Sequence, residues 1–186
     1  VLHHPAAVGE GEGGPGVAGR RMVQDGDPLE QAGTRRLNPV QVAFVERMWP
    51  HAMAAQKKSG IPAAYVVGQA ALESGWGRRD IRDADGNPSH NLFGIKAGST
   101  WDGAVVEQVT TEYQQGLAVK KTQAFRAYSG YEAAFKDYAA LLQRRYPQAA
   151  AAGAAADEFA AGLVAGGYAT DPAYADKVQR LIAQLA

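Results

Sequence analysis

The stretch AAYVVGQAALESGWGRRD, residues 63–80, indicates the central element of the fold. Its first part, AAYVVGQAAL, is small or apolar on nearly every side, which is typical of a helix at the centre of a domain. Two glycines, Gly75 and Gly77, follow closely, and glycine ends helices because it adopts left-handed backbone conformations without strain. A buried helix is therefore predicted over about residues 62–74, with one carboxylate, Glu73, in its last turn.

The position of Glu73 is unfavourable for a negative charge. The C-terminal end of a helix carries a partial negative charge, and burial among small apolar neighbours disfavours the ionised form as well. Both effects raise the pKa of a carboxyl group, which suits a general acid that must hold its proton near neutral pH. Local physics leaves a second interpretation open, in which Glu73 is a surface glutamate near a frayed helix end.

The composition excludes several classes of function. Nineteen basic and nineteen acidic residues balance over 186 residues, which argues against a general electrostatic attraction to nucleic acid or to anionic membranes. The absence of cysteine excludes a disulfide framework and a thiolate metal site. No apolar run is long enough to span a bilayer, so no membrane insertion is expected. We expect neither a metal nor a cofactor.

The chain divides near residue 38. Residues 1–37 are crowded with Gly and Pro, as in GEGEGGPGVAG, and are predicted to be a linker or the remnant of an upstream domain. The pair Asn38-Pro39 then combines a capping side chain with a proline suited to the first helical turn. Residues 38–186 are predicted to form one domain, and a monomer is expected.

The elements of this domain follow from local patterns. A first helix shows an apolar face made by Val42, Val45, Met48 and Trp49, and Pro50 is expected to break or kink it before it ends near residue 58. Residues 78–103 are mostly loop. The segments AVVEQVTTEY and LAVKKTQAFRAY, around residues 114–116, alternate in polarity and are rich in β-branched residues, which predicts a hairpin.

Three helices are expected to close the chain. The first follows a capping box made by Ser129 and Glu132, the second is an Ala-rich helix over residues 155–165, and the third starts at Asp171-Pro172. The predicted fold class is therefore α+β, mainly α, with a helical lobe and a small β-hairpin lobe.

Aromatic and acidic residues outside the central helix suggest carbohydrate chemistry. Trp76, Phe93 and Trp101 fall in predicted loops, where large aromatic rings can stack on sugars or can plug a core. The hairpin supplies two further acids, Glu107 and Glu112. Two carboxylates from separate elements, facing each other across a groove, are the usual equipment for glycoside hydrolysis.

Five motifs in order carry a resemblance to a known family: ALESGWG at 71–77, NPSHNLFGIK at 87–96, TTEY at 110–113, FRAYSGYEAAFKDY at 125–138 and GYATDPAYADK at 167–177. From about Pro39 to its C-terminus the chain resembles the peptidoglycan hydrolase domains of glycoside hydrolase family 73, a family that includes a flagellar rod-assembly protein. The resemblance implies a lysozyme-like fold with a cleft between the lobes. It also implies cleavage of the β-1,4 bond between N-acetylglucosamine and N-acetylmuramic acid.

The resemblance assigns roles to individual residues. Glu73 matches the general acid of the family, Glu112 matches the second carboxylate, and Tyr168 matches a tyrosine that assists near the reaction centre. Contacts with the glycan are expected from Trp76, Asn91, Phe93, Trp101 and Tyr128. Glu107 is the reserve for the second carboxylate, because the role of that group varies within the family.

The resemblance also implies partners and a place of action. Peptidoglycan glycan strands are the expected substrate, and flagellar rod proteins are expected to bind through an N-terminal domain missing from this chain. The implied compartment is the periplasm, where the hydrolase would open the wall for assembly of the rod.

Two alternatives remain open from the sequence. A lytic transglycosylase would also place a glutamate at a helix end but would need no second carboxylate, and such enzymes carry a GLMQ-type segment where this chain reads NLFGIK. A non-catalytic wall-binding module would keep the aromatic rings without needing both acids. A calcium loop over Asp83, Asp85 and Asn87 is rejected, because Gly86 falls too early and no glutamate closes the loop.

Overall fold

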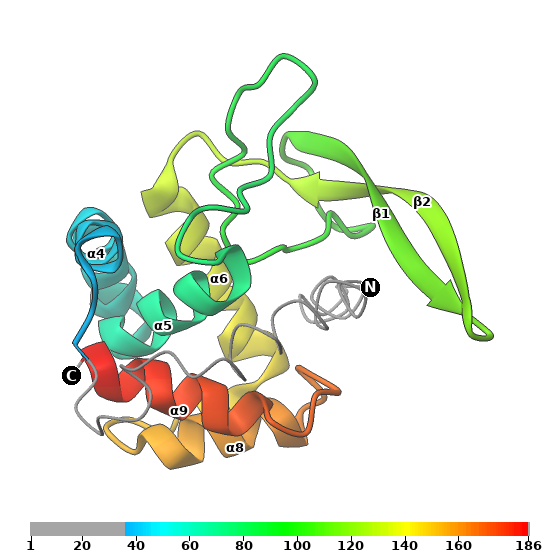
Figure 1. Ribbon diagram of the computed structural model, residues 1–186. Helices are drawn as coiled ribbons and strands as arrows, with labels where there is room; N and C mark the ends of the chain where they lie inside the picture. The colour runs from blue at the N-terminus through cyan, green and yellow to red at the C-terminus, as the bar shows by residue number, and fades with distance from the viewer. Residues whose placement is uncertain (1–35, 186) are drawn as a thin grey trace.

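Helix α5, Ala63–Ser74, lies in the middle of the helical body of the computed structural model, which describes residues 36–185 (Figure 1). Nine of its twelve residues are buried, as expected for a helix with apolar residues on nearly every side. Gly68 lets the C-terminal helix come close, because a Cβ atom there would lie only 3.4 Å from Cγ1 of Ile182. The predicted central helix is confirmed.

The chain reverses sharply just after Glu73. Gly75, Trp76 and Gly77 all have positive φ angles, of 58°, 59° and 85°. The backbone N–H of Trp76 donates to the carbonyl of Ala71, which closes the end of the helix. A glycine tolerates this conformation freely, whereas Trp76 adopts it at a cost that its surroundings must offset. Glu73 is thereby left at the edge of the helical body, on the end of a buried helix.

Helix α4, Pro39–Ser59, begins at the predicted cap. The side chain of Asn38 accepts from the backbone N–H of Gln41 at 2.9 Å, and the side chain of Gln41 accepts from the N–H of Asn38 at 2.9 Å. The predicted break at Pro50 is wrong, because the helix runs through this residue. Pro50 is exposed, so water can reach the carbonyl that its missing N–H leaves free.

The apolar face of α4 differs from the predicted one. Its buried residues are Phe44, Met48, Ala52 and Ala55, while Val42 is 39% exposed. Val45 and Trp49 pack partly against the same core. The sequence pattern placed the core face about one residue off, because Phe44 and the alanines beyond Pro50 were not counted.

The remaining helices wrap around α5. They are α6 (Tyr131–Arg145), the single turn α7 (Pro147–Ala150), α8 (Ala156–Ala165) and α9 (Tyr174–Leu185). In Figure 1, α8 and α9 lie side by side below α5, and α6 crosses behind it. The expected capping box at Ser129 is wrong, because α6 starts after Gly130 with no side-chain cap. Helix α9 starts at Tyr174, and Asp171 instead closes the preceding turn by accepting from the N–H of Ala173 at 2.9 Å.

The two strands form the predicted antiparallel hairpin, which projects away from the helices (Figure 1). Strand β1 is Val105–Gln114 and β2 is Leu117–Arg126, and the tip residues Gln115 and Gly116 both have positive φ angles. This is the turn geometry that matches strand twist in two-residue hairpins. Ile81, Val106 and Phe125 form a small separate core at the base of the hairpin. The outer half has no such core.

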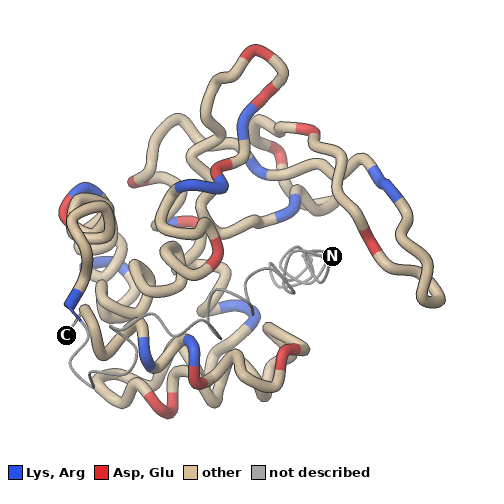
Figure 2. The backbone as a smooth tube through the Cα atoms, viewed as in Figure 1, with Lys and Arg blue, Asp and Glu red and all other residues tan. Residues whose placement is uncertain are grey.

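The long loop between α5 and β1 holds the rejected calcium motif. Asp83 accepts from the backbone N–H groups of Asp85 and Asn87 at 2.9 and 2.8 Å, so its carboxylate closes a turn. Residues 36–185 contain no group of three or more His, Asp or Glu side chains that could hold a metal ion. Within the same range, no helix is both long and apolar enough to cross a bilayer. Basic and acidic residues are distributed over the helices, the loops and the hairpin of the described chain (Figure 2).

The predicted fold class is confirmed as a mainly helical domain with one β-hairpin. The predicted linker lies almost wholly outside the described residues, and the described chain enters the domain at the cap of α4.

Candidate active site

Glu73 is half-buried in the last turn of α5 and contacts the first residue of α9. The hydroxyl of Tyr174 donates to Oε1 of Glu73 at 3.2 Å, and Nε2 of Gln69 donates to the same hydroxyl at 3.3 Å. Gln69 lies one helical turn before Glu73, so both face the same neighbour. The predicted acid is therefore in contact with a fixed hydrogen-bond donor rather than with apolar groups alone.

Tyr174 belongs to a cluster of buried tyrosines beneath the acid. The hydroxyl of Tyr138 donates to that of Tyr168 at 2.7 Å, and the rings of Tyr168 and Tyr174 stack with centroids 5.4 Å apart. Burial raises the pKa of all three phenols well above the usual value, and the nearby charge of Glu73 adds to the rise. Each of them therefore stays neutral and acts as a hydrogen-bond donor.

Tyr168 is placed differently from the expectation. Its side chain is 0% exposed, so in this structure its hydroxyl is not accessible to a substrate. A second ring, that of Tyr146, packs edge-on against it at 5.2 Å. Glycine at Gly167, with a φ angle of 78°, lets the chain turn inward here, which buries the ring instead of presenting it. An influence of Tyr168 on catalysis would have to pass through its neighbours.

Glu112 lies on β1 and is held by cationic partners. Its Oε1 accepts from Nε2 of Gln123 at 2.7 Å and lies 3.6 Å from Nζ of Lys96, while Oε2 lies 3.5 Å from Nζ of Lys121. Burial raises the pKa of Glu112, but the two ammonium groups outweigh this and leave the pKa below the usual value. Glu112 is therefore held in its ionised form.

Glu107, the reserve for the second carboxylate, lies five residues from Glu112 on the same strand. Because side chains alternate between the faces of a strand, the two acids point to opposite sides of the hairpin. Glu107 is exposed, whereas Glu112 is partly buried.

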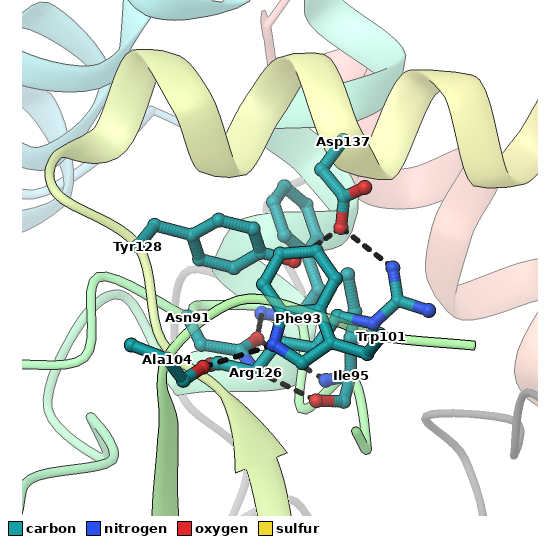
Figure 3. Close-up of polar contacts among 8 residues, drawn as sticks. All are labelled: Asn91, Phe93, Ile95, Trp101, Ala104, Arg126, Tyr128 and Asp137. Carbon is teal, nitrogen blue, oxygen red and sulfur yellow. Dashed lines mark hydrogen bonds and ion pairs between the residues drawn. The ribbon is translucent and has the colours of Figure 1, made fainter. Parts of the chain in front are cut away.

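Trp101 and Tyr128 form a partly exposed aromatic pair between the hairpin and α6 (Figure 3). Their rings meet edge to face with centroids 5.6 Å apart, and the indole N–H of Trp101 donates to the carbonyl of Ala104 at 2.9 Å. The guanidinium of Arg126 lies against one face of the indole, 4.6 Å from its centroid.

Asp137 on α6 links Tyr128 to Arg126, the residue that lies against Trp101 (Figure 3). One oxygen, Oδ2, accepts from the hydroxyl of Tyr128 at 2.5 Å and from Nη1 of Arg126 at 2.8 Å. Arg126 is 3% exposed, and its Nε has no hydrogen-bond partner among the described residues. The ion pair joins the end of β2 to the helical body and fixes the guanidinium that packs against Trp101.

Asn91 and Phe93 support the site and do not line it. Asn91 is 2% exposed, and its side-chain amide donates to the carbonyls of Ile95 and Arg126, both at 2.9 Å. Phe93 is 0% exposed and stacks on Tyr138 at 3.8 Å between centroids. The expectation that these two side chains contact the glycan is corrected, because neither presents surface to a ligand in this structure.

Trp76 remains partly exposed, directly after the acid-bearing helix. Its ring meets Phe44 edge to face at 5.9 Å, so one side of it belongs to the core. Of the five expected glycan contacts, only Trp76, Trp101 and Tyr128 keep accessible surface.

Sequence reasoning missed Tyr174, Gln69, Lys96, Arg126 and Asp137. Gln69 was treated only as part of the apolar run AAYVVGQAAL, although a polar atom buried in such a helix needs a partner. Asp137 carried a signal of its own, because it stands between Phe135 and Tyr138 on the buried side of a helix.

Comparisons with known proteins agree with this arrangement. Residues 49–186 match the glucosaminidase family, described as mannosyl-glycoprotein endo-β-N-acetylglucosaminidase. The peptidoglycan hydrolase FlgJ of Pseudomonas aeruginosa is 43% identical over 184 residues, which are 92% of this chain and 46% of that protein. The chain thus spans about half the length of this relative.

Two solved structures are similar over most of their length. A peptidoglycan hydrolase mutant from Sphingomonas sp. A1 is 51% identical with a TM-score of 0.67, covering 75% of this chain and 91% of that one. A truncated glycoside hydrolase domain of Salmonella typhimurium FlgJ is 46% identical with a TM-score of 0.68, covering 78% and 97%. With its helix-end glutamate, its hairpin carboxylate and these matches over most of its length, the chain belongs to the glucosaminidase family of glycoside hydrolases.

Proposed function

We propose that this domain hydrolyses peptidoglycan at the β-1,4 bond between N-acetylglucosamine and N-acetylmuramic acid, with Glu73 as general acid and Glu112 as the second carboxylate. The observation that carries the proposal is the contrast between the two acids. Glu112 is ion-paired with two lysines, whereas Glu73 stands at the negative end of a helix and contacts a neutral hydroxyl. Two carboxyl groups in opposite environments suit one proton donor and one ionised partner.

In this mechanism Glu73 gives its proton to the oxygen of the leaving sugar. The C-terminal end of α5 disfavours the charged form of Glu73, so the proton is retained until the bond begins to break. Glu112 enters the reaction as a carboxylate, because Lys96 and Lys121 hold it ionised, and it takes up the proton of the attacking water where it acts as the base. It would direct a water molecule to the anomeric carbon or stabilise the positive charge that develops there.

Trp101 and Tyr128 would hold the glycan by stacking against sugar rings. The buried guanidinium of Arg126 covers one face of Trp101, which leaves the rest of the indole for a ligand. Trp101→Ala is expected to weaken the binding of wall fragments, measured by calorimetry, with only a small fall in melting temperature. A large loss of stability with unchanged binding would make Trp101 a packing residue.

The test of the proposed acid is Glu73→Gln, which keeps the size and removes the transferable proton. Loss of a general acid costs about 10²–10⁴-fold in rate. Glu46→Gln is the matched control, because it makes the same change at an exposed glutamate of α4 that has no proposed role in the reaction. A folded Glu73→Gln variant with more than a tenth of the normal activity on purified peptidoglycan would exclude the assignment.

Mass spectrometry of the released fragments decides among the competing reactions. The proposed hydrolysis leaves a reducing N-acetylglucosamine end. An anhydro sugar end would identify a lytic transglycosylase, and a reducing N-acetylmuramic acid end would move the cut to the other bond. Binding of peptidoglycan with no release of fragments would identify a non-catalytic wall-binding module.

Glu112→Gln tests the second carboxylate. If Glu112 activates water, this variant should lose most activity, and proton NMR should show the inverted anomer as the first product. Activity that survives the substitution would transfer the role to the acetamido group of the substrate or to Glu107.

The cellular role is proposed by likeness to FlgJ. We place the domain in the periplasm, where it would open the wall for assembly of the flagellar rod, with rod proteins bound by parts of the protein outside this chain. Localised wall cleavage at rod assembly sites, lost in a strain carrying Glu73→Gln, is the result expected.

A further inference from the structure

The side-chain amide of Gln69 faces two tyrosine hydroxyls beneath the acid. Gln69 is 0% exposed, and its Nε2 donates to the hydroxyl of Tyr174 at 3.3 Å. The other amide atom, Oε1, has no hydrogen-bond partner among the described residues. The printed contact of the Gln69 amide is therefore the one that it donates to the oxygen of Tyr174.

This arrangement fixes the direction in which the hydroxyl protons point. A phenol has a single proton to donate. Because Gln69 already donates to the oxygen of Tyr174, the proton of Tyr174 is directed to Oε1 of Glu73 at 3.2 Å. The neighbouring Tyr138 donates instead to Tyr168 at 2.7 Å. Hydrogen bonds thus run in one direction, from Gln69 through Tyr174 to the carboxyl group.

We propose that Tyr174 is a positioning residue for the general acid: its hydroxyl, oriented by Gln69, holds the carboxyl group of Glu73 and stabilises the carboxylate formed during proton transfer. The inference rests on the proposed role of Glu73. In that step the O–H bond of Glu73 breaks, the proton passes to the leaving sugar oxygen, and the electron pair stays on the carboxylate that Tyr174 contacts.

The surroundings allow Tyr174 to act this way over a wide pH range. Burial, and then the charge of Glu73, raise the pKa of Tyr174 well above the usual value, so its proton is always present. Tyr138 from α6 and Tyr168 from the segment before α9 face the same carboxyl group and are neutral for the same reason. Two cationic groups lie near this helix end: the guanidinium of Arg79 donates to the carbonyl of Leu72 at 3.5 Å, and that of Arg78 donates to the carbonyl of Gly75 at 3.1 Å.

Tyr174→Phe tests the proposal, because it keeps the ring and removes only the hydroxyl. A hydrogen bond to a carboxylate favours the charged form, so its loss should raise the pKa of Glu73. The basic limb of the kcat/KM profile should then move up by about one pH unit, and kcat below that limb should fall about tenfold. KM for glycan fragments should change little. The loss of rate should shrink as pH rises, which a merely unstable variant would not show.

Two further variants sharpen the result. Tyr65→Phe is the matched control, since Tyr65 is also a buried tyrosine, on α5, but packs against Phe159 at 4.7 Å between ring centroids. It should keep the normal pH profile. Gln69→Leu should shift the limb in the same direction as Tyr174→Phe, and the double variant should shift it no further, because both act on one chain of hydrogen bonds.

The outcomes separate this inference from the proposed function. If Glu73→Gln retains activity, the general acid is another residue, and the proposed mechanism with Glu73 as proton donor is overturned. If Glu73→Gln is inactive while a folded Tyr174→Phe variant keeps the normal basic limb, only the positioning role is overturned. Independent, additive shifts from Tyr174→Phe and Gln69→Leu would overturn the orienting role of Gln69. If Tyr174→Phe does not fold, Gln69→Leu alone decides, since an unshifted limb in that variant contradicts the proposal.

Discussion

Removing the carboxylate of Asp137 should destabilise the joint between the hairpin and the helices. Asp137→Ala leaves the guanidinium of Arg126 buried at 3% exposure, without its 2.8 Å partner, and leaves the hydroxyl of Tyr128 without an acceptor. Breaking a buried ion pair by deleting one partner costs about 3–5 kcal/mol. The side chain of Asp137 is itself 21% exposed, so water can reach this end of the pair. We therefore expect about 3 kcal/mol, near the lower end of that range.

Thermal unfolding measures this loss. For a domain of this size the expected fall in melting temperature is about 6–12 °C, at about 2–4 °C for each kcal/mol. Asp137→Asn, which keeps one acceptor, should lose less. The double variant Arg126→Met with Asp137→Ala should be more stable than Asp137→Ala alone, because it removes the unpaired charge. A loss below about 1 kcal/mol in Asp137→Ala, or additive effects in the double variant, would refute the reasoning.

Two other predictions concern packing and pH. Gly162→Ala should cost about 1–3 kcal/mol in urea unfolding, because its Cβ would lie 2.6 Å from the backbone nitrogen of Ala149, whereas Gly130→Ala, with nothing within 4 Å, should not. Glu112, whose pKa is lowered in the folded state, should stabilise the domain above its unfolded pKa, and this contribution should vanish as pH falls through the lower, folded pKa. Glu112→Gln should therefore weaken the dependence of unfolding free energy on pH in acid, and an unchanged dependence would contradict the ion pairs.

Elements specified by local patterns were predictable from the sequence. The central helix needed only a run of apolar residues and two glycines at its end, and the hairpin needed alternation and a two-residue turn. In both cases the local preference and the tertiary environment agree. The cap at Asn38 was equally readable, because its two hydrogen bonds lie within four residues.

The sequence-based predictions differed from the structure where contacts between residues far apart in the sequence determine the conformation or the burial of a residue. Pro50 lies in a helix that has buried residues both before and after it, and it is itself exposed, so the helix continues through the proline. Phe93 was expected to contact the glycan and Tyr168 to lie near the reaction centre, but both side chains are buried and contact Tyr138. A sequence shows that an aromatic residue lies outside a regular element, yet it does not show which side of the loop faces the core.

The polar residues around Glu73 and Tyr128 were not predicted from the sequence, for a related reason. Gln69 and Tyr174 come from helices far apart in sequence, and each alone fits an apolar helix face. Their meaning depends on a contact that only the packing of α9 on α5 creates. The same holds for Arg126 and Asp137, which meet because the hairpin ends where α6 begins.

The two candidate acids, Glu73 and Glu112, have contacts in different lobes of the fold, so a movement between the lobes would change the distance between their carboxyl groups. The partners of Glu112 are Lys121, on β2, and Lys96, which bridges to Phe125 at the base of the hairpin, so its ionisation is set within the β-lobe. Tyr174, which donates to Glu73, belongs to the helical lobe. A movement of the hairpin relative to the helices would therefore change the distance between the carboxyl groups while leaving these contacts in place. Inverting and retaining glycosidases differ in that separation, about 6.5–9.5 Å against about 5–5.5 Å. Closure of the hairpin over a glycan would thus set the separation of the two carboxyl groups at which hydrolysis can occur. Glu73 and Glu112 would keep their hydrogen-bond and ion-pair partners within their own lobes during this movement.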